Sequence, residues 1–162
     1  MTQISLGIDP GPVNTGFCVT SFSPSASALL KHECINFNGL SPRAAAQRVL
    51  SACPEMPTLL TIERFVTYRG VQSDAYERTC ILVGAIGTIL ETPTLVRAID
   101  WKLAVGHFLY RQGFRNPSDK RDKKFSLAAA EFASGVKFKT DHEADAFLLS
   151  LYGYTLKKDT TE

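Results

Sequence analysis

The chain has 162 residues, of which 44% are hydrophobic, and its formal net charge is only +2. This length is enough for one domain with a substantial core, and the apolar fraction excludes a disordered chain. The four cysteines are scattered without zinc-like spacing, which indicates reduced thiols in an intracellular protein. The chain opens without a signal-peptide pattern, and its longest apolar run, Cys80 to Leu90, is too short to span a bilayer, so we expect a cytoplasmic protein.

The first predicted strand runs from Ile4 to Asp9, where apolar residues alternate with small or polar ones at the period of two that strands show. Pro10 and Gly11 then end it. Asp9 is therefore a carboxylate at the end of an apolar strand. An Asp-Pro-Gly sequence is also common in simple turns, in which the Asp side chain caps the following backbone, so Asp9 alone does not define a site.

The remaining elements follow in an α/β pattern. Strands are predicted at 17–22, 28–37, 58–63 and 94–99, and helices at 42–53, 74–91, 101–111, 123–134 and 141–156. The order is three strands, a helix, a strand, a helix, a strand and then helices, without an internal repeat or a linker. We predict a single domain over residues 1–162, in which residues 157–162 form a frayed polar tail.

The strand at 58–63 also ends in a carboxylate. It is short, apolar and bounded by prolines, which favours a buried strand in the middle of a sheet, and its last residue is Glu63. The loop that follows carries two basic and two aromatic side chains: Arg64, Phe65, Tyr68 and Arg69.

The last predicted helix opens with the sequence DHEADA, which begins at Asp141. Acidic residues are favoured in a first helical turn, which accounts for Asp141 as a cap and for Glu143. Asp145 is different, because it lies a full turn into the helix, between alanines and ahead of apolar residues. A carboxylate on a packed face needs a partner or a cation. His142, three residues earlier, can lie on the same side of the helix.

Four side chains at strand and helix ends thus form a candidate metal site: Asp9, Glu63, His142 and Asp145. Carboxylate oxygens without a thiol favour Mg²⁺ or Mn²⁺ over structural zinc. Two such ions about 4 Å apart can activate a water and stabilise the leaving oxygen in phosphodiester hydrolysis. His142 could bind a metal or act as a base on the water, and the spacing does not separate these roles.

Positive charge is concentrated in one segment. Between Arg97 and Lys124 there are eight Lys or Arg and only three Asp. Such a segment is typical of a phosphate-facing surface, and the alternative is a solvated loop. Its most basic part contains four candidate DNA-binding residues: Lys120, Arg121, Lys123 and Lys124.

Together these motifs resemble those of the RuvC-type Holliday-junction resolvases, a family of the RNase H-like superfamily. The resemblance rests on GIDPG and TG at residues 7–16, IE at 62–63 and HEADA at 142–146, in this order, and covers nearly the whole chain. It implies an RNase H-like fold with a five-stranded mixed sheet flanked by helices. It also implies a DNA recombination and repair endonuclease that resolves four-way junctions by paired symmetric hydrolysis, leaving 5′-phosphate and 3′-hydroxyl ends.

The resemblance also assigns roles to residues. It implies that the four residues of the candidate metal site are catalytic and hold two Mg²⁺ ions, for which Mn²⁺ can substitute. It places basic residues near the scissile phosphate at Lys102 and Lys124, and an aromatic residue that stacks at the crossover at either Phe65 or Tyr68. Arg64 stands where the family more usually has Gln, so the chemistry of this loop and any sequence preference stay open.

A homodimer is the family's solution to a junction with two equivalent strands. The apolar helix at 74–91, which contains the small residues Gly84, Ala85 and Gly87, is the candidate dimer contact, and packing on its own sheet is nearly as consistent with the pattern. A bacterial or viral origin fits the resemblance. Whether a branch-migration helicase acts with the protein stays open.

Two other functions fit the same pattern. The first is a broader nuclease for branched DNA, which would need the same four site residues. The second is a catalytically silent RNase H-like module that only binds nucleic acid, although such a module has no need of acids at three strand or helix ends. An ATPase of this superfamily is excluded, because the chain is too short for two repeated halves with phosphate-binding glycine loops.

Overall fold

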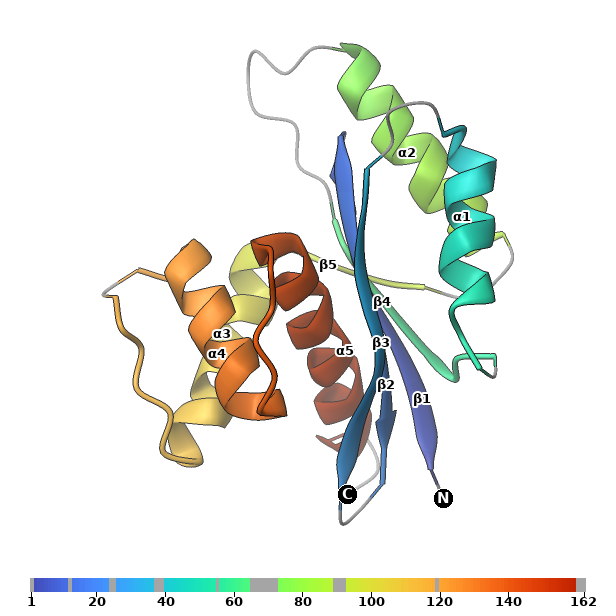
Figure 1. Ribbon diagram of the computed structural model, residues 1–162. Helices are drawn as coiled ribbons and strands as arrows, with labels where there is room; N and C mark the ends of the chain where they lie inside the picture. The colour runs from blue at the N-terminus through green and yellow to red at the C-terminus, as the bar shows by residue number, and fades with distance from the viewer. Residues whose placement is uncertain are drawn as a thin grey trace.

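The computed structural model, shown in Figure 1, describes residues 2–11, 13–23, 26–36, 40–54, 56–64, 73–88, 93–118 and 120–159. Within these ranges the strands of a single sheet are β1 (Gln3–Asp9), β2 (Asn14–Phe22), β3 (Ser27–Asn36), β4 (Leu59–Glu63) and β5 (Thr94–Val96). The helices are α1 (Pro42–Ser51), α2 (Ser73–Gly87), α3 (Ala98–Arg111), α4 (Lys123–Ser134) and α5 (Asp141–Asp159). The predicted α/β fold with a five-stranded mixed sheet is confirmed.

The strand order of the sheet is β3-β2-β1-β4-β5. β1 and β3 are antiparallel to β2, whereas β4 is parallel to both β1 and β5. Ile8 of β1 lies beside Ile62 of β4, so the next residues, Asp9 and Glu63, follow at the same edge of the sheet. The parallel pairing therefore brings together two acids that are far apart in the sequence.

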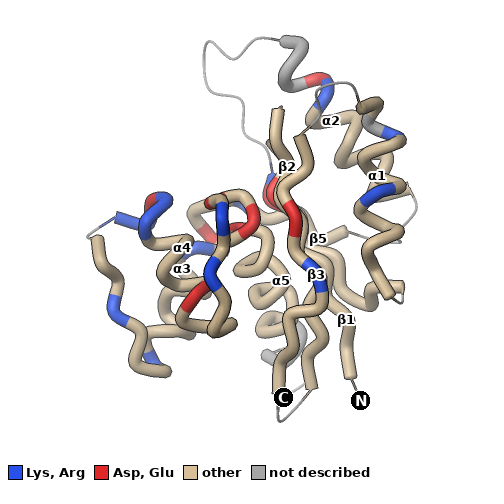
Figure 2. The backbone as a smooth tube through the Cα atoms, in the orientation of Figure 1, with Lys and Arg blue, Asp and Glu red and all other residues tan. Residues whose placement is uncertain are grey.

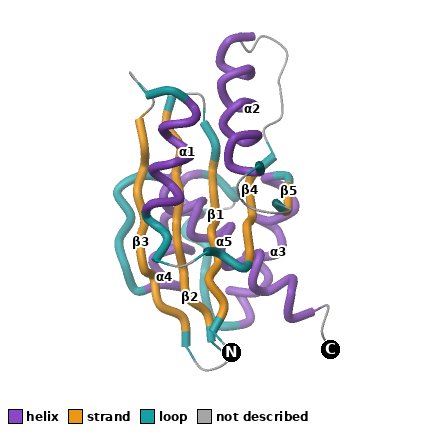
Figure 3. The backbone as a smooth tube through the Cα atoms, turned by 90° about the vertical axis from the view of Figure 1, so that its right-hand side faces the viewer, coloured by secondary structure: helices purple, strands orange, loops and turns teal. Residues whose placement is uncertain are grey.

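Helices cover both faces of the sheet (Figures 1 and 3). α1 and α2 lie on one face, where Val49 and Leu82 join Ile8 in a buried cluster. α3, α4 and α5 lie on the other face, around a second buried cluster that includes Trp101 and Leu148. No helix in the described ranges is long and apolar enough to cross a membrane.

Helix α5 lies directly against the sheet because β1 and β2 present glycines to it. A Cβ atom at Gly7 would collide with the backbone carbonyl of Ala146, and one at Gly16 would collide with that of His142. The Ser5 hydroxyl also donates to the Ser150 carbonyl across 2.9 Å. This close contact places the first two turns of α5 next to Asp9, which points to the same face as Gly7 because side chains alternate along a strand.

We expect Gly7→Ala to destabilise the fold by about 3 kcal/mol or more, because the added methyl must displace helix backbone rather than a flexible side chain. Gly84→Ala on α2 is the matched control. A Cβ there meets nothing within 4 Å, and Ala is the better helix former by up to about 1 kcal/mol. Urea unfolding of both variants measures the difference, and equal stability of the two would contradict the packing described above.

Several boundaries differ from the predicted ones. β2 begins at Asn14, three residues before the predicted start, and α5 continues to Asp159, so residues 157–159 of the expected frayed tail are helical. The expected strand at 94–99 ends at Val96, and α3 begins at Ala98, because β4 ends opposite Val96 and provides no partner beyond it. The sequence predicts that Asp100 caps a helix that begins at Trp101, but Asp100 lies in the first turn of α3, where it pairs with Arg97 at 2.6 Å. Helix α2 ends at Gly87, and residues 89–91, which the prediction included in it, lie outside the described residues.

Candidate active site

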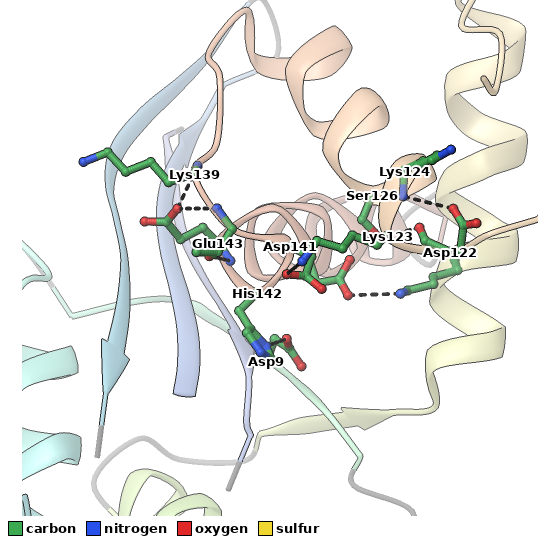
Figure 4. Close-up of polar contacts among 12 residues, drawn as sticks. Asp9, Asp122, Lys123, Lys124, Ser126, Lys139, Asp141, His142 and Glu143 are labelled. Atoms are coloured by element: carbon green, nitrogen blue, oxygen red, sulfur yellow. Dashed lines mark hydrogen bonds and ion pairs between the residues drawn. The ribbon is translucent and has the colours of Figure 1, made fainter. Parts of the chain in front are cut away.

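Three acids from three elements meet at the carboxyl ends of β1 and β4. Asp9 ends β1, Glu63 ends β4, and Asp145 lies one turn into α5. Asp9 and Asp145 are each only 9% exposed. Each acid has a hydrogen-bond donor of its own, and Figure 4 shows the contact between Asp9 and His142. The structure thus brings together the four side chains of the predicted metal site.

The acids are close enough to oppose one another's ionisation. Burial, followed by the charge of Asp9, raises the pKa of Glu63 from its ordinary 4.5 to about 7. Burial also raises the pKa of Asp145, and the Asp9 charge adds to this effect, while the charge of Lys102 opposes it. Perturbed carboxyl groups of this kind are typical of functional sites.

His142 is the partner of Asp9. Its Nδ1 atom lies 2.5 Å from Oδ2 of Asp9, and the imidazole side chain is 35% exposed. The hydrogen bond to Asp9 raises the pKa of His142 against the opposing effect of burial. The raised pKa favours the protonated imidazole as long as no other cation lies beside Asp9. Because the side chain is partly exposed, this proton can be released to solvent.

The other two acids are held by neighbouring residues of α3. Lys102 Nζ donates to Asp145 Oδ2 across 3.0 Å, and the indole nitrogen of Trp101 donates to Glu63 Oε2 across 2.8 Å. Lys102 was predicted to face the scissile phosphate, and it lies at the acid site. Trp101 was not predicted to have a role here. The one sequence feature that could have indicated this role is that the chain's single tryptophan directly precedes Lys102.

The carboxylate oxygens and the imidazole nitrogen of this site suit a hard divalent cation, although the described side chains are not arranged around one. Among the described residues, no three His, Cys, Asp or Glu side chains are arranged to enclose an ion. Asp145 Oδ1, however, is buried and accepts no hydrogen bond of normal geometry from the described residues. The Ser126 hydroxyl, which lies close enough to lower the pKa of Asp145, donates to the Asp122 carbonyl. A buried carboxylate oxygen with spare acceptor capacity is a favourable position for Mg²⁺.

A capping box positions the start of α5. The Glu143 backbone N–H donates to the Thr140 hydroxyl, and the Glu143 carboxylate accepts from the Thr140 and Lys139 N–H groups. Thr140 is therefore the cap, and the expectation that Asp141 has this role is wrong. Asp141 instead pairs with Lys123 at 2.7 Å (Figure 4). The capping box fixes the first turn, which carries His142 towards Asp9.

Apart from Lys102, the predicted DNA-binding side chains lie in two parts of the chain, around the start of α4 and in the segment after β4. Lys120, Arg121, Lys123 and Lys124 are exposed around the start of α4, where Figure 2 shows basic segments near the first turn of α5. Arg64 is exposed directly after Glu63, and its backbone N–H donates to the Val96 carbonyl. The remaining three, Phe65, Tyr68 and Arg69, lie outside the described residues.

Stability should depend on pH through Glu63. Because its pKa is raised in the folded state, the folded protein binds this proton more tightly than the unfolded chain, and stability falls as pH rises from about 4.5 to about 7. Glu63→Gln keeps an acceptor for Trp101 without the charge. In chelator, we expect the variant to match the wild type near pH 4.5 and to exceed it by roughly 3 kcal/mol at pH 8. Unfolding at both pH values measures this, and a pH-independent difference would contradict the raised pKa.

Solved structures of RuvC superpose on this chain, whereas no family profile and no curated protein sequence matches it. RuvC of Thermus thermophilus in complex with a Holliday junction substrate gives a TM-score of 0.71 at 16% identity, covering 99% of this chain and 98% of RuvC. A second T. thermophilus RuvC structure gives 0.70 at 17% identity, with the same coverage. Fowlpox virus resolvase with a Holliday junction gives 0.49 at 14% identity, covering 94% and 98%.

The fold is that of the RNase H-like class, and an acidic centre lies at the carboxyl ends of two parallel strands. Within that class, the superposition on RuvC over nearly the full length of both chains confirms, at the level of the fold, the resemblance that the sequence motifs predicted.

Proposed function

We propose that this chain is a metal-dependent endonuclease that resolves four-way DNA junctions. The observation that carries the proposal is the meeting of Asp9, Glu63 and Asp145 at one edge of the sheet, where the charge of Asp9 opposes the ionisation of the other two. The fold shared with RuvC, which has been solved with a Holliday junction substrate, supports a junction as the substrate. The reaction is paired symmetric hydrolysis that leaves 5′-phosphate and 3′-hydroxyl ends.

The proposed cofactor is Mg²⁺, with Mn²⁺ as a substitute and two ions per site. Asp9, Glu63 and Asp145 would supply carboxylate oxygens, and His142 a ring nitrogen after losing its proton. The buried Oδ1 of Asp145, which accepts no hydrogen bond of normal geometry from the described residues, supports this assignment, as does a donor set of oxygen and nitrogen atoms. Bound ions would lower the pKa of a water and offset charge on the leaving oxygen.

The protein's own side chains complete the site. Lys102 neutralises the charge of Asp145 until a bound cation does so. Its ammonium group would then be available to donate a hydrogen bond to the phosphate of the substrate. Trp101 is fully buried and fixes the orientation of the Glu63 carboxylate. His142 is partly exposed, so it can release the proton that it holds beside Asp9 to solvent.

We propose a homodimer with α2 as the contact, since a four-way junction presents two equivalent strands. Ile81 on this helix is 48% exposed, and Gly84 leaves open space beside it. A groove of about 350 Å³ runs from Glu63 along Val83 and Gly84 to Leu95. An apolar contact on this helix would therefore lie close to the acid site.

The experiment that tests the function is cleavage of a labelled four-way junction beside a replication fork and a plain duplex, each with Mg²⁺, with Mn²⁺ and with chelator. We expect paired symmetric nicks in the junction, dependent on metal, and little cutting of duplex. Equal cutting of every branched substrate would indicate a broader debranching nuclease. Binding without cutting under either metal would indicate a catalytically silent module.

A further inference from the structure

The connection between α3 and α4 encloses a polar pocket that is separate from the acid site. The pocket has a volume of about 350 Å³ and is lined by Tyr110, Arg115, Asn116, Ser118 and Arg121. The connection lies on the outer side of α3 and α4, away from the sheet (Figure 1), and Figure 2 shows basic segments along it. Each of these five side chains carries a hydrogen-bond donor, and among the described residues no acid lines the pocket.

Hydrogen bonds within the connection hold the pocket in shape. The Asn116 side chain donates to the Lys120 carbonyl across 3.1 Å and accepts from the Ser118 N–H across 3.2 Å. The Ser118 hydroxyl accepts from the Lys120 N–H across 3.1 Å. The loop therefore does not need to fold around a ligand, so binding loses less conformational entropy.

The two arginines are positioned but keep donors free. The Nε atom of Arg121 lies 3.3 Å from where a Cβ of Gly106 would be, so the side chain rests on α3 where the helix has no side chain of its own. Arg115 uses one nitrogen, Nη1, to donate to the Phe114 carbonyl across 2.9 Å. A guanidinium has five N–H donors, so most remain available to a ligand.

No described carboxylate neutralises these arginines. Neither Arg115 nor Arg121 forms an ion pair within the described residues. The nearby acid Asp122 caps α4 through the Lys124 and Phe125 N–H groups, and its other carboxylate oxygen accepts from the Ser118 hydroxyl across 3.4 Å. Two guanidiniums that share one preformed pocket and form no ion pair with the described residues match the geometry and charge of a phosphate group.

We propose that this pocket binds a backbone phosphate of a duplex DNA arm, at a distance from the phosphate that is cut. The proposal rests on the proposed function. DNA is favoured over a free anion because the pocket is continuous in the chain with the exposed Lys120, Lys123 and Lys124, which extend the positive charge towards the first turn of α5. A second anchor of this kind would orient an arm relative to the acid site, as phosphate contacts do without reading sequence.

The test uses the full chain in chelator, so that binding is measured without cleavage. Arg115→Gln and Arg121→Gln are compared with Arg43→Gln, which removes the same charge from an exposed position on α1, across the sheet. For a labelled four-way junction, we expect each pocket variant to lower affinity roughly fivefold to tenfold at 0.1 M salt and to reduce the salt slope by about one. Arg43→Gln should change neither quantity, and thermal unfolding confirms that all three variants fold.

The outcomes separate the sources of phosphate and separate this proposal from the proposed function. Titration of the wild type with inorganic phosphate, followed by NMR, is the second arm. Saturable phosphate binding with unchanged junction affinity in both pocket variants would overturn the DNA assignment in favour of a small anion. Loss of affinity in the pocket variants, even if the wild type cuts no junction, would support the DNA anchor while refuting the nuclease. Equal losses of junction affinity in all three variants would overturn the proposed phosphate anchor and would not bear on the proposed nuclease activity.

Discussion

Asp145→Asn should abolish junction cleavage, lowering the rate by at least about 1000-fold, while junction affinity changes by less than about threefold. The substitution keeps the size of a buried side chain and its contact with Lys102 but removes the charge that would hold a cation. The basic surface that we propose to bind DNA is unchanged. Single-turnover cleavage with saturating enzyme measures the rate, and titration of labelled junction in chelator measures the affinity.

Asp141→Asn is the matched control for this prediction. Asp141 lies one turn earlier on the same helix and pairs with Lys123. Its charge contributes to the raised pKa of His142, but it is not among the causes that shift the pKa of Glu63 or Asp145. We expect its variant to cleave within about threefold of the wild type. Comparable losses of cleavage in both variants would mean that the general charge of the first turns of α5 matters more than a ligand at residue 145. Loss of junction binding in a folded Asp145→Asn protein would also count against the assignment.

Lys102→Gln should combine a catalytic defect with a metal-dependent loss of stability. Removal of the ammonium leaves the buried Asp145 charge without its ion-pair partner, which should lower metal-free stability by about 2 kcal/mol. Added Mg²⁺ should restore most of this loss, so the rise in melting temperature on adding Mg²⁺ should be larger in the variant. Cleavage should fall by about 10-fold to 100-fold, because the donor to the phosphate is gone.

Lys139→Gln is the control for this second prediction. Figure 4 shows the Lys139 side chain pointing away from the acid cluster, and its backbone N–H, which the substitution preserves, donates to Glu143. It should show the wild-type response to Mg²⁺ and cleave normally. If Mg²⁺ stabilised Lys102→Gln no more than it stabilises Lys139→Gln, the ion and Lys102 would not share Asp145.

Periodicity and local signals were enough to predict most of the fold. The alternation along β1, the start of α1 at Pro42 and the predicted bounds of α4, Lys123 to Ser134, are all confirmed. The wrong cap of α5 had a local signal that was missed, the pair Thr140 and Glu143, whereas the error at β5 falls where a boundary depends on another part of the chain. β5 stops at Val96 because β4 offers no further partner, and no local pattern contains that information.

The sequence by itself determined which residue types stand at the ends of β1, β4 and the first turns of α5, and these types indicated metal chemistry. Only the tertiary structure decided how those residues meet. Gly7 and Gly16 let α5 touch the sheet, and the parallel pairing of β1 with β4 sets Asp9 beside Glu63. The tertiary structure also places the Trp101 indole against Glu63 and the Lys102 ammonium group against Asp145. These contacts depend on burial and on distances between elements far apart in the chain, which spacing along one segment cannot encode.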